Sequence, residues 1–94
     1  MFEVIDQSGR EIRISKERLS HILKHPEMTN MIPDILMTLR TPLKITDYSV
    51  DAQVHYYYSY HKERNSKARF LRVIVKYLNG HGFVITAYFV ERMK

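Results

Sequence analysis

Two alternating segments near the end of the chain constrain its fold more than any other feature. Residues 70–77 and 83–90 each alternate in the manner of a β-strand, and Asn79 and Gly80 open the short segment between them. An Asn-Gly pair favours a tight turn, because both residues tolerate a positive φ. The two segments therefore predict an antiparallel hairpin.

Other segments predict further strands. Residues 54–60 contain four tyrosines, which favour the β conformation, and residues 43–46 predict a shorter strand. At the start of the chain, residues 2–6 and 11–14 flank a Gln-Ser-Gly-Arg turn and predict a second hairpin.

Two amphipathic segments predict helices. The first, residues 16–24, follows the N-cap residue Ser15 and ends before Pro26. The second opens at residues 30–33, where a first-turn proline is tolerated, and stops before Pro42. Their apolar faces consist of Leu19, Ile22 and Leu23 in the first helix and Ile32, Ile35, Leu36 and Leu39 in the second.

These elements predict an α+β fold. We expect an N-terminal hairpin and two helices packed on one face of an antiparallel sheet of about four strands, because helices with one apolar side need a sheet to cover. The length suits one domain, residues 1–94, since nothing in the sequence repeats and no low-complexity linker divides it.

The composition narrows the classes of partner. Fifteen Lys and Arg against ten Asp and Glu give a net charge of +5, which favours polyanionic partners such as RNA and also serves solubility. No apolar run reaches the roughly 20 residues of a membrane span, so we expect no membrane insertion. The absence of cysteine excludes disulfides and thiolate sites, and it makes a cytoplasmic location the default expectation.

Strand alternation predicts a basic open face on the sheet. In residues 70–77 and 83–90, the fully apolar sets should meet the helices, and these sets are Leu71, Val73, Val75 and Tyr77, and Phe83, Ile85, Ala87 and Phe89. The opposite sets would then present Arg72, Lys76, Thr86 and Tyr88 together on a face open to water.

This open face has two interpretations. Arg72 and Lys76 can each hold a phosphate, and Tyr57, Tyr88 and His55 can offer rings to the bases of single-stranded RNA. The same side chains also suit a plain solvated side of a sheet. The basic loop of residues 61–69 has the same pair of interpretations, a contact for an RNA backbone or simply solvated charge.

Arg18, His21 and His25 form a stripe along the first helix, next to its apolar face. The histidines have the i, i+4 spacing of zincin ligands, but the glutamate that follows the first histidine in zincins is missing, so we expect no metal. His25 can instead serve only to end the helix, where its charge suits the helix dipole. The third interpretation is catalysis or phosphate contact by the imidazoles.

The chemistry that fits these residues best is metal-free cleavage of RNA, without a cofactor. The 2′-hydroxyl attacks its own phosphodiester, which requires a general base and a general acid, and histidine suits both tasks near neutral pH. Arg18, Arg72 or Lys76 can stabilise the negative charge of the transition state. Thr86 or Tyr88 can orient the phosphate by hydrogen bonding.

The order of these features resembles the small nucleases of the barnase–EndoU–colicin–RelE superfamily, above all its phage-associated and toxin-like branches. The resemblance covers residues 15–90 and rests on the His-x-x-x-His-Pro helix, a second helix ending Thr-Leu-Arg-Thr-Pro, and a closing Phe-Val-Ile-Thr-Ala-Tyr. It implies an α+β fold, metal-independent RNA cleavage of toxin type, and a partner antitoxin or immunity protein. By position it implicates His21, His25, Tyr57, Lys76, Thr86 and Tyr88.

Two other functions stay open. The same fold can serve as an RNA-binding or antitoxin-binding module without turnover. Alternatively, the tyrosine-rich strand of residues 54–60 can pair with the edge of another chain and form a homodimer.

Overall fold

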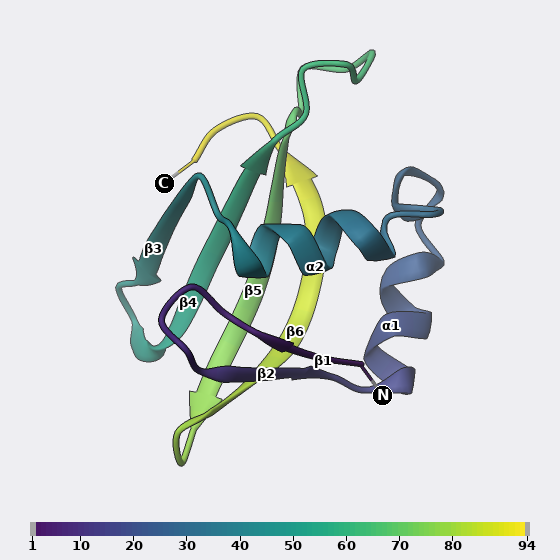
Figure 1. The fold of residues 1–94 in the computed structure, drawn as a ribbon. Helices are drawn as coiled ribbons and strands as arrows, with labels where there is room; N and C mark the ends of the chain where they lie inside the picture. The colour runs from purple at the N-terminus through teal and green to yellow at the C-terminus, as the bar shows by residue number, and fades with distance from the viewer. Residues whose placement is uncertain (1, 94) are drawn as a thin grey trace.

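The computed structural model describes residues 2–93, which form an α+β fold with one mixed sheet (Figure 1). Within this range the sheet has six strands in the order β1-β2-β6-β5-β4-β3. The strands are β1 (Phe2–Ile5), β2 (Glu11–Ile14), β3 (Lys44–Tyr48), β4 (Asp51–Tyr60), β5 (Phe70–Leu78) and β6 (His81–Val90). The helices are α1 (Lys16–Leu23), the 3-10 turn η1 (Pro26–Met28) and α2 (Ile32–Arg40). None of these helices is long and apolar enough to cross a membrane.

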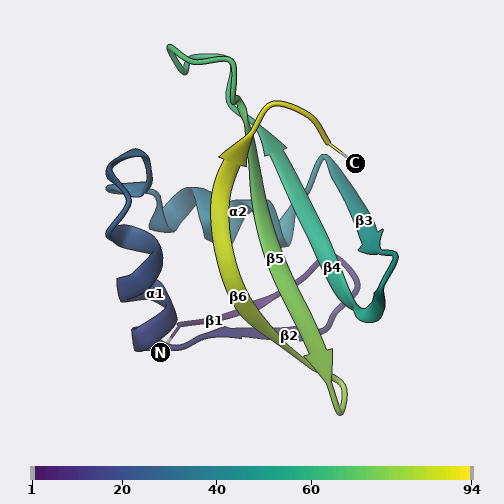
Figure 2. The ribbon, with the colours of Figure 1, turned by 180° about the vertical axis from the view of Figure 1, so that it is seen from behind.

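The helices form where their end signals predict. The side-chain oxygen of Ser15 accepts a hydrogen bond from the Arg18 backbone N–H at 3.1 Å, so Ser15 caps α1 as expected. In α2 the predicted apolar face is confirmed, because Ile35 and Leu39 are fully buried. Seen from behind, β6, β5 and β4 lie in front of α2, while α1 lies beside β6 in both views (Figure 2).

The sheet is larger than predicted and is not purely antiparallel. The N-terminal hairpin belongs to it, because β2 pairs in parallel with β6, with Ile12 opposite Gly82 and Arg13 opposite Phe83. All other neighbouring strands are antiparallel. A parallel pair between segments so distant along the chain leaves no local turn signal, so strand patterns could not reveal it.

The tyrosine-rich strand is not at the edge of the sheet over most of its length. β4 has hydrogen-bonded neighbours on both sides, β3 and β5, and residues 55–58 pair with both, so this part offers no free edge to another chain. A homodimer stays a prediction. The predicted turn between β5 and β6 is confirmed, since Asn79 and Gly80 both have positive φ, 53° and 81°.

A bulge in β6 changes which side chains share a face. Ile74 lies opposite Thr86, but the next residue, Val75, lies opposite Val84, so Ile85 has no partner on β5. Val84 therefore enters the core at 2% exposure, and Phe83 comes to the face opposite the helices, across from Lys76. The expectation that Phe83 would meet the helices is wrong, because simple alternation does not allow for the extra residue.

The core lies between the helix-covered face of the sheet and the helices. Residues from both layers are fully buried there, among them Ile12, Ile14, Ile22, Met28, Ile35, Leu39, Leu71, Val73 and Val75. Burial of each such side chain contributes about 1.5–3 kcal/mol of transfer free energy. The other face of the sheet, which includes Arg72, Lys76 and Tyr88, is the open face.

Candidate nucleic-acid interface

Arg72 lies at the centre of the open face, held by tyrosines from the neighbouring strands. Register places Tyr58 of β4 and Tyr88 of β6 directly opposite it on either side. Its Nε donates to the Tyr58 hydroxyl at 3.0 Å and its Nη1 to the Tyr88 hydroxyl at 3.2 Å. The guanidinium carbon also lies 4.8 Å from the centre of the Tyr56 ring. The tyrosines thus fix the direction of the guanidinium plane.

This environment keeps Arg72 charged. Burial alone would lower the pKa of Arg72, but its hydrogen bonds with Tyr88 and Tyr58 raise the pKa above its ordinary value. A guanidinium has five N–H donors, and the two bonds to tyrosine hydroxyls use two of them. The partly exposed group therefore has donors available for an anion at the surface of the sheet.

The other predicted residues of the open face do not all gather around Arg72. Thr86 and Tyr88 lie on the same side of β6, so alternation and register bring both of them beside Arg72 as expected. Lys76 lies four residues further along β5, about 13 Å at the usual rise of a strand. There its Nζ is 3.3 Å from the Asp51 carboxylate, which makes it part of an ion pair near the other end of the face.

Tyr57 lies on the helix-covered face, contrary to the role predicted for it in RNA binding. It is 1% exposed, and register places it opposite Val73 of the core. The outer members of the three-tyrosine run, Tyr56 and Tyr58, lie on the side of the open face instead, where Tyr56 is half-buried and Tyr58 is fully buried. His55 has the same orientation as Tyr57, since it lies opposite Val75, with its ring against Tyr77 and its Nδ1 2.8 Å from Asp47. The period of two along β4 separates Tyr57 from Tyr56 and Tyr58, but it does not say which set faces the helices.

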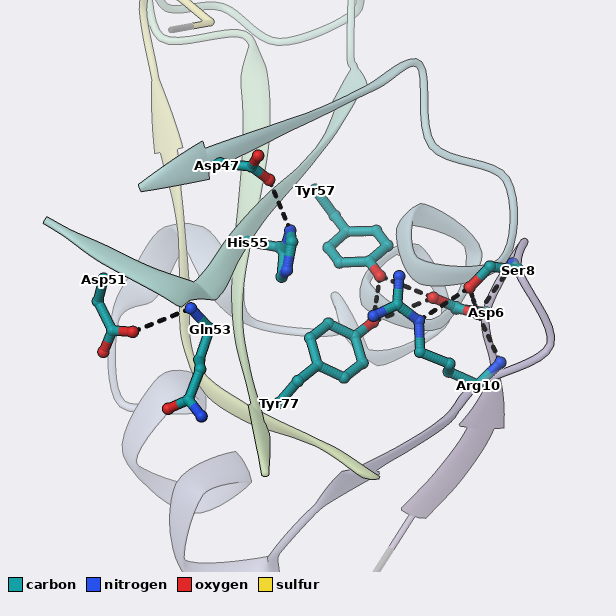
Figure 3. Close-up of polar contacts among 9 residues, drawn as sticks. All are labelled: Asp6, Ser8, Arg10, Asp47, Asp51, Gln53, His55, Tyr57 and Tyr77. Carbon is teal, nitrogen blue, oxygen red and sulfur yellow. Dashed lines mark hydrogen bonds and ion pairs between the residues drawn. The ribbon is translucent and has the colours of Figure 1, made fainter. Parts of the chain in front are cut away.

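Tyr57 belongs to a buried polar cluster with Asp6 and Tyr77 (Figure 3). Both hydroxyls donate to Asp6 Oδ2, at 2.8 Å from Tyr57 and 3.0 Å from Tyr77, and the two hydroxyls also contact each other. Asp6 Oδ1 accepts from the backbone N–H groups of Ser8 and Arg10, at 2.9 and 2.8 Å. The cluster therefore ties the turn of the N-terminal hairpin to β4 and β5.

The cluster shifts the pKa values of its members. Burial alone would raise the pKa of Asp6, but hydrogen bonds from Tyr57, Ser8, Arg10 and Tyr77 outweigh it and lower the pKa to about 2. Burial raises the pKa of Tyr77 to about 12, and burial together with the bonds to Tyr77 and Asp6 raises the pKa of Tyr57. An ionised acceptor with neutral phenol donors is a stable arrangement, and we assign this cluster a structural role.

The predicted stripe of α1 lies at the flank of the sheet. Arg18, His21 and His25 are all exposed, and the imidazole rings of the two histidines lie edge to face with centres 6.3 Å apart. Arg18 Nη1 donates to the backbone carbonyl of Ile85, the bulge residue of β6, at 3.5 Å. Within residues 2–93, neither imidazole makes a hydrogen bond or ion pair with a residue of the open face. The stripe thus reaches the edge of β6 through Arg18.

Neither a metal centre nor a known relative adds to this candidate interface. In the part of the chain that the structure describes, no three His, Asp or Glu side chains gather closely enough to hold a metal ion. No protein-family model, curated protein or solved structure matches the chain significantly. The resemblance to the barnase–EndoU–colicin–RelE superfamily therefore stays a prediction.

Proposed function

We propose that this protein is a metal-independent endoribonuclease of toxin type, which binds RNA on the open face and cleaves it with the histidines of α1. The observation that carries the proposal is the contact between Arg18 and the Ile85 carbonyl, at 3.5 Å. It joins the stripe of α1 to the bulge of β6, one residue before Thr86 on the open face. Candidate acid–base groups and candidate phosphate-binding groups therefore border the same strand.

The open face supplies the groups that a phosphodiester needs. Arg72 presents a fixed, charged guanidinium, and a planar guanidinium matches the oxygens of a phosphate in pairs. Thr86 and Tyr88 add hydroxyls beside it, and the Tyr56 ring, which stacks on Tyr48, supports the guanidinium. In this proposal, Arg72 holds the phosphate and stabilises the charge of its transition state, while Arg18 does so from the side of α1.

The two imidazoles would carry the proton transfers. One of His21 and His25 takes the proton of the 2′-hydroxyl as it attacks phosphorus, and the other gives a proton to the departing 5′-oxygen. Both side chains are exposed, which allows an RNA strand lying against β6 to reach them. Lys76 lies further along β5 and is paired with Asp51, so we assign it to binding a more distant phosphate.

The first prediction tests the histidines directly. The His21→Ala/His25→Ala variant should lose at least about a hundredfold of RNA cleavage rate in EDTA, because each general acid or base contributes about 10² or more. His81→Ala is the matched control, since His81 is also exposed but begins β6 just after the turn from β5, and it should cleave like the wild type. The measurement is the digestion rate of a mixed RNA pool.

The free energy of unfolding shows whether the double variant loses activity through its chemistry or through unfolding. Both histidines are exposed and outside the core, so the double variant should keep its free energy of unfolding within about 0.5 kcal/mol of the wild type. Full cleavage activity in a folded double variant would remove His21 and His25 from the mechanism.

A non-catalytic RNA-binding module is the second candidate. The observation in its favour is that Arg72 and its tyrosines form an interface on their own, without contact with either imidazole. It predicts salt-sensitive binding of RNA by the wild type with no cleavage, either with or without chelator. The same digestion assay, run beside a binding assay, distinguishes the two functions.

An antitoxin or immunity protein would inhibit the proposed ribonuclease by covering the open face or the α1 stripe.

A further inference from the structure

The loop between β4 and β5, residues 61–69, projects beyond the ends of both strands (Figure 1). It is strongly basic, with Lys62, Arg64, Lys67 and Arg69 against the single acidic residue Glu63. The proposed function gives this loop no role. It continues β4 and β5 beyond one end of the sheet, and its base packs against Phe89 on the helix-covered side.

The base of the loop is fixed by hydrogen bonds. The His61 backbone N–H donates to the Arg69 carbonyl at 2.8 Å, which closes the loop. The His61 side chain is buried, with its Nε2 2.9 Å from the Ser59 hydroxyl and its ring edge to face with Phe89. Its Nδ1 faces Glu63 at 3.4 Å, so the one carboxylate of the loop points toward the imidazole.

The loop is also braced from within. The Arg64 guanidinium stacks 3.6 Å from the centre of the Phe89 ring, and its Nε donates to the Ala68 carbonyl at 2.9 Å. The Ala68 backbone N–H in turn donates to the Ser66 hydroxyl at 3.1 Å. Arg64 is therefore a structural cation, and it holds the rest of the loop in a defined shape.

This shape forms a concavity with cationic walls. Its volume is about 470 Å³, and it is lined by Asn65, Ser66, Lys67 and Arg69. Arg69 Nε donates to the Ser66 carbonyl at 2.9 Å, which orients the guanidinium. Among residues 2–93, no carboxylate lies within ion-pair distance of Lys67 or Arg69. The concavity thus combines two uncompensated cations with amide and hydroxyl groups, which is a chemistry that suits a phosphate.

An aromatic pair connects the concavity to the open face. Tyr60 and Phe70 are the last residue of β4 and the first of β5, and their ring centres lie 5.1 Å apart. Tyr60 is 50% exposed. From Arg72 to Arg69 the chain advances three residues, about 10 Å at the rise of a strand. The exposed ring of Tyr60 and the half-buried ring of Phe70 therefore lie between Arg72 and the loop along the two strands.

We propose that the β4–β5 loop is a second phosphate-binding site, at which Lys67 and Arg69 hold the backbone of a single RNA strand as it leaves the open face. The inference rests on the proposed function, since it requires RNA on the open face. A basic loop held by internal hydrogen bonds suits such a site, because a fixed site loses less entropy on binding than a mobile one.

The second prediction tests the loop by binding alone. The probe is a labelled RNA of about 12 nucleotides with 2′-O-methyl sugars, which cannot be cleaved by 2′-hydroxyl attack. Lys67→Gln/Arg69→Gln should bind it about tenfold more weakly than the wild type, and the slope of log affinity against log salt should flatten by about 1.4, at about 0.7 for each lost phosphate contact. Fluorescence anisotropy at several salt concentrations measures both.

Matched controls separate the site from net charge. Lys16→Gln/Arg40→Gln removes the same charge from exposed helix positions and should change the affinity less than about twofold. A dinucleotide version of the probe, whose single phosphodiester cannot occupy Arg72 and the loop at the same time, should bind the wild type and the loop variant alike. Equal affinity of the loop variant and the control for the longer probe would overturn the loop proposal and leave the proposed function standing.

Failure of the proposed function gives a different pattern. If neither RNA binds the wild type, both the proposed function and the proposal for the loop are contradicted. Saturable binding of inorganic phosphate by the wild type in that case would assign the concavity to a free phosphate compound, which also overturns the RNA proposal.

Discussion

Asp6 shows how much structure one buried carboxylate can organise. It accepts hydrogen bonds from Ser8 and Arg10 within its own hairpin and from Tyr57 and Tyr77 across the core. A carboxylate buried without partners would strongly destabilise the fold, and these donors replace the water that it loses. The bonds connect the N-terminal turn with two central strands.

The third prediction concerns the pH dependence that Asp6 produces. Its folded pKa of about 2 lies below the ordinary value of 3.8, so its ionised form stabilises the fold above pH 4. That contribution, about 2 kcal/mol, is lost as the pH falls from about 4 toward 2. Asp6→Asn should therefore reduce the free energy of unfolding at pH 7 and should lack this part of the acid destabilisation. Urea unfolding at pH 7, 4 and 2.5 measures both effects, and parallel pH curves for the two proteins would contradict the assignment.

Individual residues are also where sequence-based prediction fails most clearly. Tyr56, Tyr57 and Tyr58 are consecutive and have the same intrinsic preference for a strand. Only the register of β4 against β5 decides which of them face the helices. Tyr57 lies on the face opposite to the predicted one for this reason. Asp6 has no local signal that singles it out, because its partners Tyr57 and Tyr77 lie 51 and 71 residues further along the chain.

Among the elements, β6 owes its pattern of buried side chains to a β-bulge. The bulge at Ile85 reverses the alternation, so that Val84 and Ala87 both enter the core although they are three residues apart. It also leaves Ile85 without a partner on β5, and the carbonyl of this residue accepts the bond from Arg18. The extra residue thus allows both Val84 and Ala87 to be buried, and its carbonyl accepts a hydrogen bond from α1.

The fourth prediction concerns Gly82, where three strands meet. It lies opposite Ile12 of β2 and Tyr77 of β5, and a Cβ added there would come within 2.9 Å of the Tyr77 ring and 3.0 Å of the Ile12 side chain. Gly82→Ala should therefore lower the free energy of unfolding by about 1–3 kcal/mol, as overpacking does. Thermal or urea unfolding measures the loss.

Gly80→Ala is the matched control for this crowding. Gly80 has a φ of +81° but no neighbour within 4 Å of an added Cβ, so its substitution carries only the backbone cost of a positive φ, about 1 kcal/mol. A larger loss at Gly80 than at Gly82 would contradict the crowding argument.

Most elements could be predicted because their signals are local. The cap at Ser15, the turn at Asn79 and Gly80, and the period of two in β5 each act over a few residues, and the structure confirms them. The pairing of β2 with β6 and the bulge in β6 depend on contacts between distant segments. Such contacts have no signature in a single stretch of sequence, so neither the joining of the N-terminal hairpin to the sheet nor the position of Phe83 could be predicted correctly.

The two faces of the sheet divide the protein into a packed side, covered by helices, and a side with the candidate interface. Arg72, Thr86 and Tyr88 could be grouped from the sequence, because alternation and a hairpin suffice to place them together. The distance of Lys76 from them and its pairing with Asp51 could not. Nor could the position of α1 at the flank of β6, since it depends on how the helix packs.

The fifth prediction concerns the distribution of stability across the sheet. β5 lies between β4 and β6 with its alternate residues buried, whereas β1 and β3 are the edges of the described sheet. Backbone amides of β5, such as those of Val73 and Val75, should therefore exchange with deuterium slowest, and those of β3 markedly faster. Hydrogen exchange followed by NMR measures the rates, and equal protection of β3 and β5 would contradict this ranking.

The parallel pair of β2 and β6 has a consequence for the newborn protein. Its partners, Ile12 and Gly82, are 70 residues apart in the order of synthesis. At ribosomal speeds of about 5–20 residues per second, β2 emerges roughly 4 to 14 s before the strand it must join. During that interval β2 has an unpaired edge, because β6 has not yet been synthesised. The sheet can therefore be completed only at the end of translation.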